Sequence, residues 1–392
     1  MGQTLSEPKL ERSLELLIDG KLTDNLNKEA SKNMSNISAV ACSVQGWRIS
    51  MEDAHILLND EEFYCFGVYD GHGGDSTAIK VNAEFPKLLK AMYQQHVKDK
   101  SNPKHFEKWL VESYLEMDKS LYNQNDQSGA TAVSVQIQYP HVYTANAGDS
   151  RALLCRNGLA YGLSFDHKPT LENELKRIYE KGGFVEFGRV NGNLALSRAF
   201  GDFEYKQAYG QGKPALECIV TCMPDVSHVE LTTDDEFIVV ACDGIWDCLS
   251  NQDCANLVRE QIATISIDYN KEKDPAYHPL PLKRSSDNHN SELDWLELVA
   301  ERVMDRCVAP KAEFGGVGCD NMTIIIVALC HGKSLKEWKQ GIEEKWRTKN
   351  NLSPPTNRHG PVHWLLGTPQ YGPEQTPQPQ TPKEEGTTCL YR

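Results

Sequence analysis

Acidic side chains stand at the ends of apolar, strand-like runs in four separate stretches of the sequence. The first is VYDGHGG (68–74), in which Asp70 and three glycines follow the run FYCFGVY. Glycine weakens a strand end, and an aspartate beside a buried run needs a compensating partner, so fold maintenance alone seldom explains this mixture. The other three stretches are WRISMEDAH with Glu52 and Asp53, VVACDGIWDC with Asp243 and Asp247, and GVGCDNMTIIIV with Asp320.

If these segments converge, their carboxylates need positive charge. Two like charges ~4 Å apart repel by about 4 kcal/mol at an effective dielectric of ~20, so a cluster of acids must take up cations or protons. Oxygen ligands, including the carbonyl of Gly71, favour Mg²⁺ or Mn²⁺ over Zn²⁺. Two such ions, bridged by Asp70 and roughly 3.5 to 4 Å apart, would activate a bridging water for in-line attack on phosphorus.

Two basic side chains beside the acids suit the same chemistry. Arg48 carries the planar fork that matches two phosphate oxygens, and His72 could protonate a departing alkoxide. Each residue alone has a simpler explanation: a strand-end aspartate is usually a turn residue, Arg48 a surface ion-pair partner and His72 a hydrogen-bonded loop residue. The hypothesis therefore depends on all of them together.

Composition narrows the classes of protein. The chain has 392 residues and a formal charge of −14, which argues against nucleic acid as a partner and suits divalent cations. Its apolar runs fall well short of the roughly 20 residues of a membrane span. The start, MGQTLSEPKLERS, lacks a signal core, so we expect a cytoplasmic protein with reduced cysteines, and membrane-associated or nuclear pools as alternatives. The cysteines form no zinc-binding pattern.

Periodicity predicts an α+β fold with three parts. Residues 9–20 have the spacing of a short amphipathic helix within an N-terminal extension (1–37). The catalytic domain (38–347) groups its strands and helices, which favours antiparallel sheets over a doubly wound parallel sheet. Helices are predicted at 103–122, 170–181, 251–263 and 335–346, with another around 296–307. A polar insertion (266–291) and a Pro/Gln-rich tail (348–392) are predicted to be a surface loop and a disordered segment.

Eight motifs in order resemble the metal-dependent serine/threonine protein phosphatases of type 2C, over roughly residues 38 to 331. They are RISMEDA (48–54), YDGHGG (69–74), SGATAV (128–133), NAGDSRALL (146–154), DHKP (166–169), NGNLALSRAFGD (191–202), CDGIWD (242–247) and CDNMT (319–323). The chain departs from the family at Ala130, where serine or threonine is common, and at the insertion, so substrate contacts there do not carry over.

The resemblance implies a four-layer α-β-β-α sandwich with a binuclear Mn²⁺ or Mg²⁺ centre, and hydrolysis of phosphoserine and phosphothreonine in proteins by metal-bound water or hydroxide. It implies a ligand role for each acid by motif position. One metal would be bound by Glu52, Asp70 and the Gly71 carbonyl, and the other by Asp70, Asp243 and Asp320. Asp53 would orient ligands or metal-bound water, and Asp149 and Asp247 would join Asp243 in a weaker third site. Arg48 resembles the phosphate-binding arginine and His72 the proposed general acid.

Three other functions must be weighed. Cys42 and Arg48 have the C-x5-R spacing of a cysteine phosphatase, but no histidine precedes Cys42 and no helix start follows to bind phosphate. A phosphatase-like scaffold that binds phosphopeptides without turnover is disfavoured by the complete set of acids. A metal-dependent phosphodiesterase is disfavoured because an acidic chain attracts nucleic acid poorly.

The N-terminus carries a separate signal. MGQTLS fits the pattern for myristoylation of Gly2, which would give only reversible contact with a membrane. The alternative is an ordinary solvated start. We expect phosphorylated proteins as partners and a monomeric chain, and a role in signalling follows from that substrate class.

Overall fold

The computed structural model describes residues 4–17, 37–122, 127–207, 212, 215–268, 282–284, 294–312 and 316–350. Gly2, most of the predicted insertion and the tail beyond residue 350 lie outside these residues. Among the described residues, no helix has the length and apolar character needed to cross a membrane.

Two antiparallel sheets form the centre of the described chain. The larger has the strand order β10 (Leu159–Gly162), β9 (Arg151–Arg156), β15 (Asp235–Ala241), β17 (Met322–Leu329), β2 (Ile37–Arg48), β1 (Thr4–Leu17) and β16 (Leu282–Arg284). The smaller has the order β14 (Asp225–Glu230), β8 (His141–Ala147), β7 (Ala132–Gln138), β4 (Tyr64–Tyr69) and β3 (Ala54–Asn59). Only the pairing of β1 with β16 is parallel within them.

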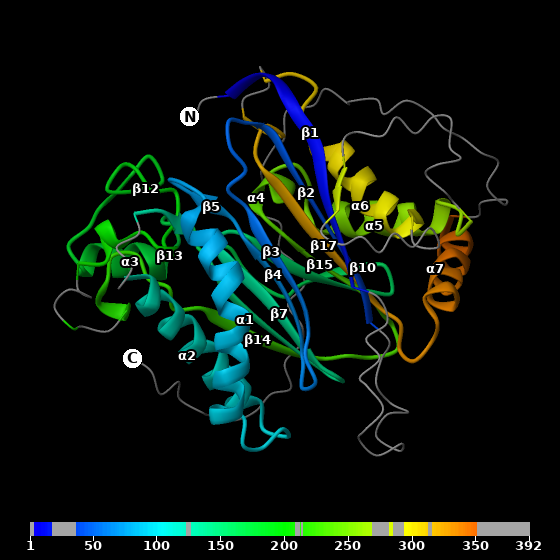
Figure 1. Cartoon of the computed structure of the whole chain (residues 1–392), viewed down its shortest axis with the longest axis horizontal. Helices are drawn as coiled ribbons and strands as arrows, with labels where there is room; N and C mark the ends of the chain where they lie inside the picture. Colours follow the sequence, from blue (N-terminus) through cyan, green and yellow to red (C-terminus); the bar gives the residue numbers. More distant parts are fainter. Residues whose placement is uncertain are drawn as a thin grey trace. The chain divides into compact units, whose positions relative to one another are not determined.

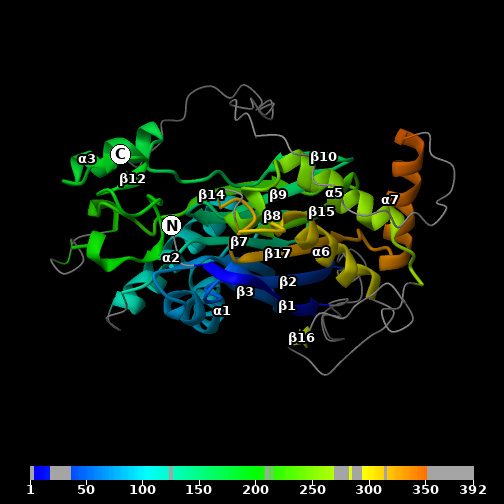
Figure 2. The ribbon, with the colours of Figure 1, turned by 90° about the horizontal axis from the view of Figure 1, so that it is seen from above.

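Helices cover the outer faces of both sheets. In Figure 1, α1 (Ser76–His96) and α2 (Pro103–Tyr122) lie on one side of the strands, and α5 (Asn251–Thr264), α6 (Asp294–Cys307) and α7 (Leu335–Asn350) lie on the other. This arrangement confirms the predicted α-β-β-α sandwich. In Figure 2, the segment with α3 (Glu172–Glu180) and β12 (Arg189–Val190) lies on the left of the described ribbon, and α7 lies on the right. β12 pairs with β11 (Val185–Glu186) in a two-stranded hairpin.

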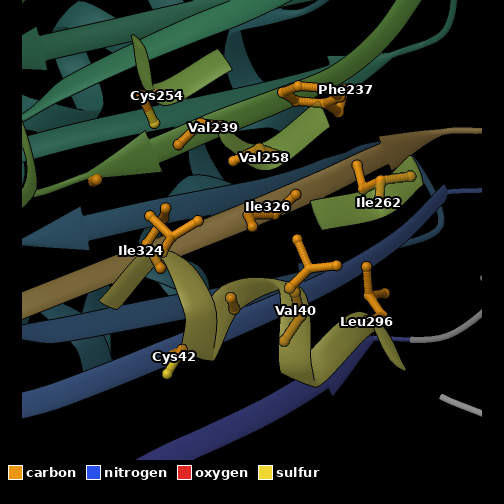
Figure 3. Close-up of a cluster of buried hydrophobic side chains, with 14 of the residues drawn as sticks. Val40, Cys42, Phe237, Val239, Cys254, Val258, Ile262, Leu296, Ile324 and Ile326 are labelled. Carbon is orange, nitrogen blue, oxygen red and sulfur yellow. The ribbon is translucent and has the colours of Figure 1, made fainter. Parts of the chain in front are cut away.

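The alternation of side chains along β17 explains how one strand serves two cores. Ile324 and Ile326 face the helices α5 and α6, whereas Ile325 and Val327 face the smaller sheet. Successive side chains of a strand point to opposite faces, so a strand buried on both sides has to be apolar throughout. Figure 3 shows the helix-facing core, where Val258 and Ile262 of α5 meet the side chains of the larger sheet.

The predicted helix at 9–20 is wrong, because residues 4–17 form strand β1. The apolar residues of this segment fit both the period of a helix and the period of a strand. Leu10, Arg12, Leu14 and Leu16 also alternate at the spacing of a strand, and Leu14 is buried in the helix-facing core. Pairing with β2 supplies backbone partners that a short isolated helix cannot match, since such helices are marginal in water.

The other helix predictions are confirmed to within a few residues at α2, α3, α5, α6 and α7. The 21-residue helix α1 was not predicted, and it contains Pro86. Of the predicted insertion, residues 266–268 and 282–284 are described, and the latter form β16. The remaining residues of the insertion, 269–281 and 285–291, and residues 351–392 of the tail lie outside the described residues.

Candidate metal centre and phosphate site

The strand ends that carry the predicted acids lie at one end of both sheets. In the larger sheet, Ala241 pairs with Ile324 on one side and with Arg151 on the other, so the end of β15 meets the starts of β17 and β9. In the smaller sheet, the end of β4 lies beside the start of β7, whose Ala132 pairs with Ala147 at the end of β8. The strand ends and connecting segments at this end carry the predicted site residues.

Asp70 and Asp243 are the centre of this acidic cluster. Burial raises the pKa of Asp70 well above its ordinary value, and the charges of Asp243, Asp53, Asp149 and Asp320 raise it further, in that order. Burial likewise raises the pKa of Asp243, with Asp149 and Asp320 as the largest charge contributions. Carboxylates from segments as far apart in sequence as Asp53 and Asp320 therefore lie close enough to repel one another.

Asp53 lies beside Asp70 in the same cluster. One oxygen each of Asp53 and Asp70 and the sulfur of Cys242 lie within 4.8 Å of one another. Asp53 Oδ2 accepts a hydrogen bond of 2.7 Å from Thr323 Oγ1, whereas its Oδ1 is buried and has no partner among the described atoms. Burial raises the pKa of Asp53 to about 6. An orphaned carboxylate oxygen that faces other acids is suited to bind a cation or a cation's water.

Glu52 and Gly71 are held together by close backbone packing. A Cβ at Gly71 would lie 2.3 Å from the carbonyl oxygen of Glu52, so only glycine fits this position. The amide of Glu52 donates to Asn321 Oδ1 at 2.9 Å, and Asn321 Nδ2 donates to the carbonyls of Gln45 and Ser50. Asn321 thus holds the loop that carries Glu52 next to the loop that carries Asp320.

Arg48 ends β2 and points to the acids. Its Nη2 lies 2.5 Å from Asp320 Oδ2, and the side chain remains partly exposed. Burial lowers the pKa of Arg48, but the charges of Asp320, Asp243 and Asp70 leave it above its ordinary value. The guanidinium has five N–H donors, so donors remain for a phosphate at the rim of the cluster.

His72 is held by an aspartate that the sequence analysis did not assign. His72 Nε2 lies 2.7 Å from Asp202 Oδ2, across strand β6 (Gly129–Ala130). A Cβ at Gly129 would lie 2.3 Å from His72 Nε2 and 2.4 Å from Asp202 Oδ2, so this glycine leaves the space in which the two side chains meet. Burial lowers the pKa of His72, but the charge and hydrogen bond of Asp202 leave it above its ordinary value.

Asp149 and Asp247 lie beside a lysine. Asp149 forms an ion pair with Lys168, and its charge contributes to the raised pKa of both Asp70 and Asp243. Partial burial raises the pKa of Asp247, which Lys168 lowers and Asp149 raises. Asp149, Asp247 and Asp243, the residues of the predicted third site, therefore lie close enough to influence one another, and Lys168 supplies positive charge among them.

This set of donors fits hard divalent cations. The candidate donors are carboxylate oxygens and a glycine carbonyl, and burial together with the charges of neighbouring acids raises the pKa of several of the acids. The cysteine alternative does not fit, because Cys42 is fully buried in the helix-facing core on β2. A nucleophile in that position could not reach a protein-bound phosphate.

Three site residues were missed although their motifs were recognised. Asp202 ends NGNLALSRAFGD, Lys168 belongs to DHKP and Asn321 to CDNMT. Each acts on a partner far away in sequence, since Asp202 is 130 residues from His72 and Asn321 is 269 residues from Glu52. The motifs signalled that these residues matter, whereas their roles depended on the fold.

Comparison with known proteins gives a consistent result. The family model described as protein phosphatase 2C matches residues 37–313. A probable protein phosphatase 2C of Caenorhabditis elegans is 40% identical over 338 residues, which is 85% of this chain and 82% of that protein. Protein phosphatase 2C homolog 2 of Schizosaccharomyces pombe is 40% identical over 88% of this chain and 83% of that protein.

Solved structures show the same fold. A phosphatase from Toxoplasma gondii has a TM-score of 0.58 at 23% identity and covers 76% of this chain and 94% of its own. A sex-determining protein of C. elegans has a TM-score of 0.59 at 21% identity and covers 82% of this chain and 69% of its own.

Proposed function

The chain belongs to the protein phosphatase 2C family and is a metal-dependent protein serine/threonine phosphatase, and we propose that it uses a binuclear Mn²⁺ or Mg²⁺ centre for this reaction. The observation that carries the proposal is the convergence on Asp70 of acids from four other segments, whose charges add to the burial that raises its pKa. Glu52, Asp70 and the Gly71 carbonyl would hold one ion, and Asp70, Asp243 and Asp320 the other. Asp149 and Asp247 would hold a weaker third ion with Asp243.

When bound, the ions would supply Lewis-acid chemistry, activating a water and stabilising charge on the phosphate. The protein's own side chains bind the phosphate, orient the reacting groups and transfer protons. Arg48 binds phosphate oxygens from the rim, where Asp320 holds its guanidinium. Asp53, fixed by Thr323, accepts hydrogen bonds at its free oxygen. His72, whose Nε2 is engaged by Asp202, holds at Nδ1 the proton that the leaving serine or threonine alkoxide takes up.

The test uses a phosphothreonine peptide and chelator-treated protein. We expect no turnover without metal, recovery with Mn²⁺ or Mg²⁺, and at least two Mn²⁺ sites per chain by isothermal titration calorimetry. Asp70→Asn should abolish turnover and weaken both of the tightest sites, because Asp70 is the proposed bridge.

Two outcomes would contradict the proposal. Turnover that survives complete removal of metal would exclude the binuclear centre. A folded protein that binds Mn²⁺ but hydrolyses no phosphopeptide would instead be a scaffold. Cys42→Ala is the control for the cysteine alternative, and it should retain metal-dependent activity.

We also propose that Gly2 is myristoylated, which would place the chain at membranes reversibly. Mass spectrometry of the protein from its native host tests this, and an unmodified or acetylated terminus would contradict it.

A further inference from the structure

Two histidines meet at the end of the smaller sheet that lies away from the acidic cluster. His141 begins β8 and His228 lies on the edge strand β14, and His228 Nε2 is 3.1 Å from His141 Nδ1. In the register of these strands, Glu230 is directly opposite His141, and Tyr143 is opposite His228. Opposed residues and residues two apart share a face of the sheet, so the four side chains lie on one face.

We propose that His141, His228 and Glu230 form a binding site for one Zn²⁺ ion, separate from the carboxylate centre. Zinc bonds to imidazole nitrogen at about 2.0–2.1 Å in a tetrahedral arrangement, which places two such nitrogens about 3.3 Å apart. The observed separation of 3.1 Å is close to this value. Without the ion, one ring donates an N–H to the other, and the ion takes the place of that proton.

Aromatic stacking holds the His228 ring in position. The ring of Tyr143 stacks on His228 with a centroid distance of 4.7 Å and an interplanar angle of 18°. Tyr143 is buried and stacks in turn on Phe106 of α2 at 4.3 Å and 5°. A ligand whose orientation is already fixed loses less conformational entropy on binding, which favours a metal site.

Glu230 supplies the third ligand. It is exposed, and its carboxylate makes no hydrogen bond or ion pair with any described residue. Its charge acts on His228 and raises the pKa of that ring, although burial and His141 lower the pKa more. Rotation of this exposed side chain would bring an oxygen to the two nitrogens, and water would complete four ligands.

The two centres differ in place and in chemistry. His141 and Ala147 are at opposite ends of β8, about 20 Å apart at the rise of a β-strand. Imidazole ligands favour Zn²⁺, whereas the oxygen ligands of the acidic cluster favour Mg²⁺ or Mn²⁺. A Zn²⁺ ion here would join the edge strand β14 to β8 without touching the catalytic residues.

Zinc binding to the full chain tests the proposal. Protein kept in millimolar Mg²⁺ is titrated with Zn²⁺ by calorimetry, then dialysed against micromolar Zn²⁺ and analysed for bound metal by mass spectrometry. We expect the wild type to retain one more Zn²⁺ than His228→Ala, and the affinity of that site to fall at least tenfold in the variant. Glu230→Gln should weaken the same site less. The matched control is His105→Ala, because His105 is a half-buried histidine, as His141 is, and its ring bonds the backbone of Asp99.

A second variant keeps the result independent of one substitution. His141→Gln should lose the same ion as His228→Ala, while both variants keep the wild-type melting temperature and Mg²⁺-dependent phosphatase activity without zinc. Equal zinc content and affinity in the wild type and both histidine variants would overturn the proposal, and so would an equal loss in His105→Ala.

Discussion

Two clusters of buried charge in this chain have opposite electrostatics. In the acidic cluster, Asp70 and Asp243 have raised pKa values because they are buried and because other acids surround them. In the second cluster, Glu174 of α3 accepts hydrogen bonds of 2.7 Å from Arg177 and from Arg198. Burial alone would raise the pKa of Glu174, but the two arginines lower it to about 2.

This difference in charge balance distinguishes a functional site from a cluster that stabilises the fold. The Glu174 cluster has its positive charges built in, and Ser197 Oγ also donates to Glu174 at 2.6 Å, so the cluster stabilises the fold around α3. In the acidic cluster, Arg48 and Lys168 supply too little positive charge to balance the acids. Repulsion between the acids therefore lowers the stability of the folded state, and a bound cation can remove this repulsion. Residues that impair stability in this way are typical of functional sites.

The largest expected effect is on activity at the acidic cluster. Asp243→Asn should lower kcat at least about a thousandfold, because it removes a proposed metal ligand from the place where charge develops in the transition state. In chelator, the melting temperature of this variant should stay the same or rise, since the substitution relieves repulsion. Asp234→Asn, in the exposed turn that precedes β15, is the control and should change neither value. A kcat near that of the wild type would remove Asp243 from the site.

At the Glu174 cluster the same kind of substitution should affect stability. Glu174→Gln removes the buried carboxylate that pairs with the largely buried Arg177 and Arg198 and leaves Arg198 only Asp225, and breaking a buried ion pair costs about 3–5 kcal/mol. Chemical unfolding in urea measures this loss. Glu180→Gln on the same helix changes only an exposed pair with Lys176 and should cost less than about 1 kcal/mol. Equal losses of unfolding free energy in the two variants would show that the Glu174 cluster does not stabilise the fold.

The acidic cluster was predictable from the sequence because each acid adjoins an apolar strand, and strand ends meet at sheet edges. The partners of these acids were not. Asp202 reaches His72 only because Gly129 leaves space between them, which no local pattern reveals. The N-terminal strand was missed for a related reason: the spacing at 9–20 suits a helix, and the backbone partners that decide for a strand belong to β2.

The two clusters should also respond to pH with opposite sign. Glu174 has a folded pKa of about 2 against an ordinary 4.5, so its stabilisation is complete above pH 4.5 and is lost as pH falls toward 2. This loss amounts to about 3 kcal/mol at 1.36 kcal/mol per pKa unit. Asp70 and Asp243 have raised folded pKa values, so in chelator the folded state gains stability as pH falls below those values toward the ordinary 3.8.

Urea unfolding in chelator from pH 8 to pH 2.5 measures both the gain of stability from the acidic cluster and the loss of stability from Glu174. Mn²⁺ should remove the gain on acidification, and Glu174→Gln should reduce the loss below pH 4.5. A stability that falls steadily from pH 8 downward in chelator would contradict the raised pKa values of the acids.

The smallest expected effect distinguishes the rim of the acidic cluster from its centre. Arg48→Ala should raise KM for a phosphopeptide about tenfold, or about 1.4 kcal/mol, and change kcat less, because the guanidinium binds phosphate from a partly exposed position. Arg48→Lys should recover part of this loss, since an ammonium keeps the charge but not the two parallel donors. Substitution also frees Asp320 from its ion pair, so Mn²⁺ affinity should rise or stay the same. Steady-state kinetics and calorimetry measure both quantities, and an unchanged KM in Arg48→Ala would leave this arginine with only a structural role on Asp320.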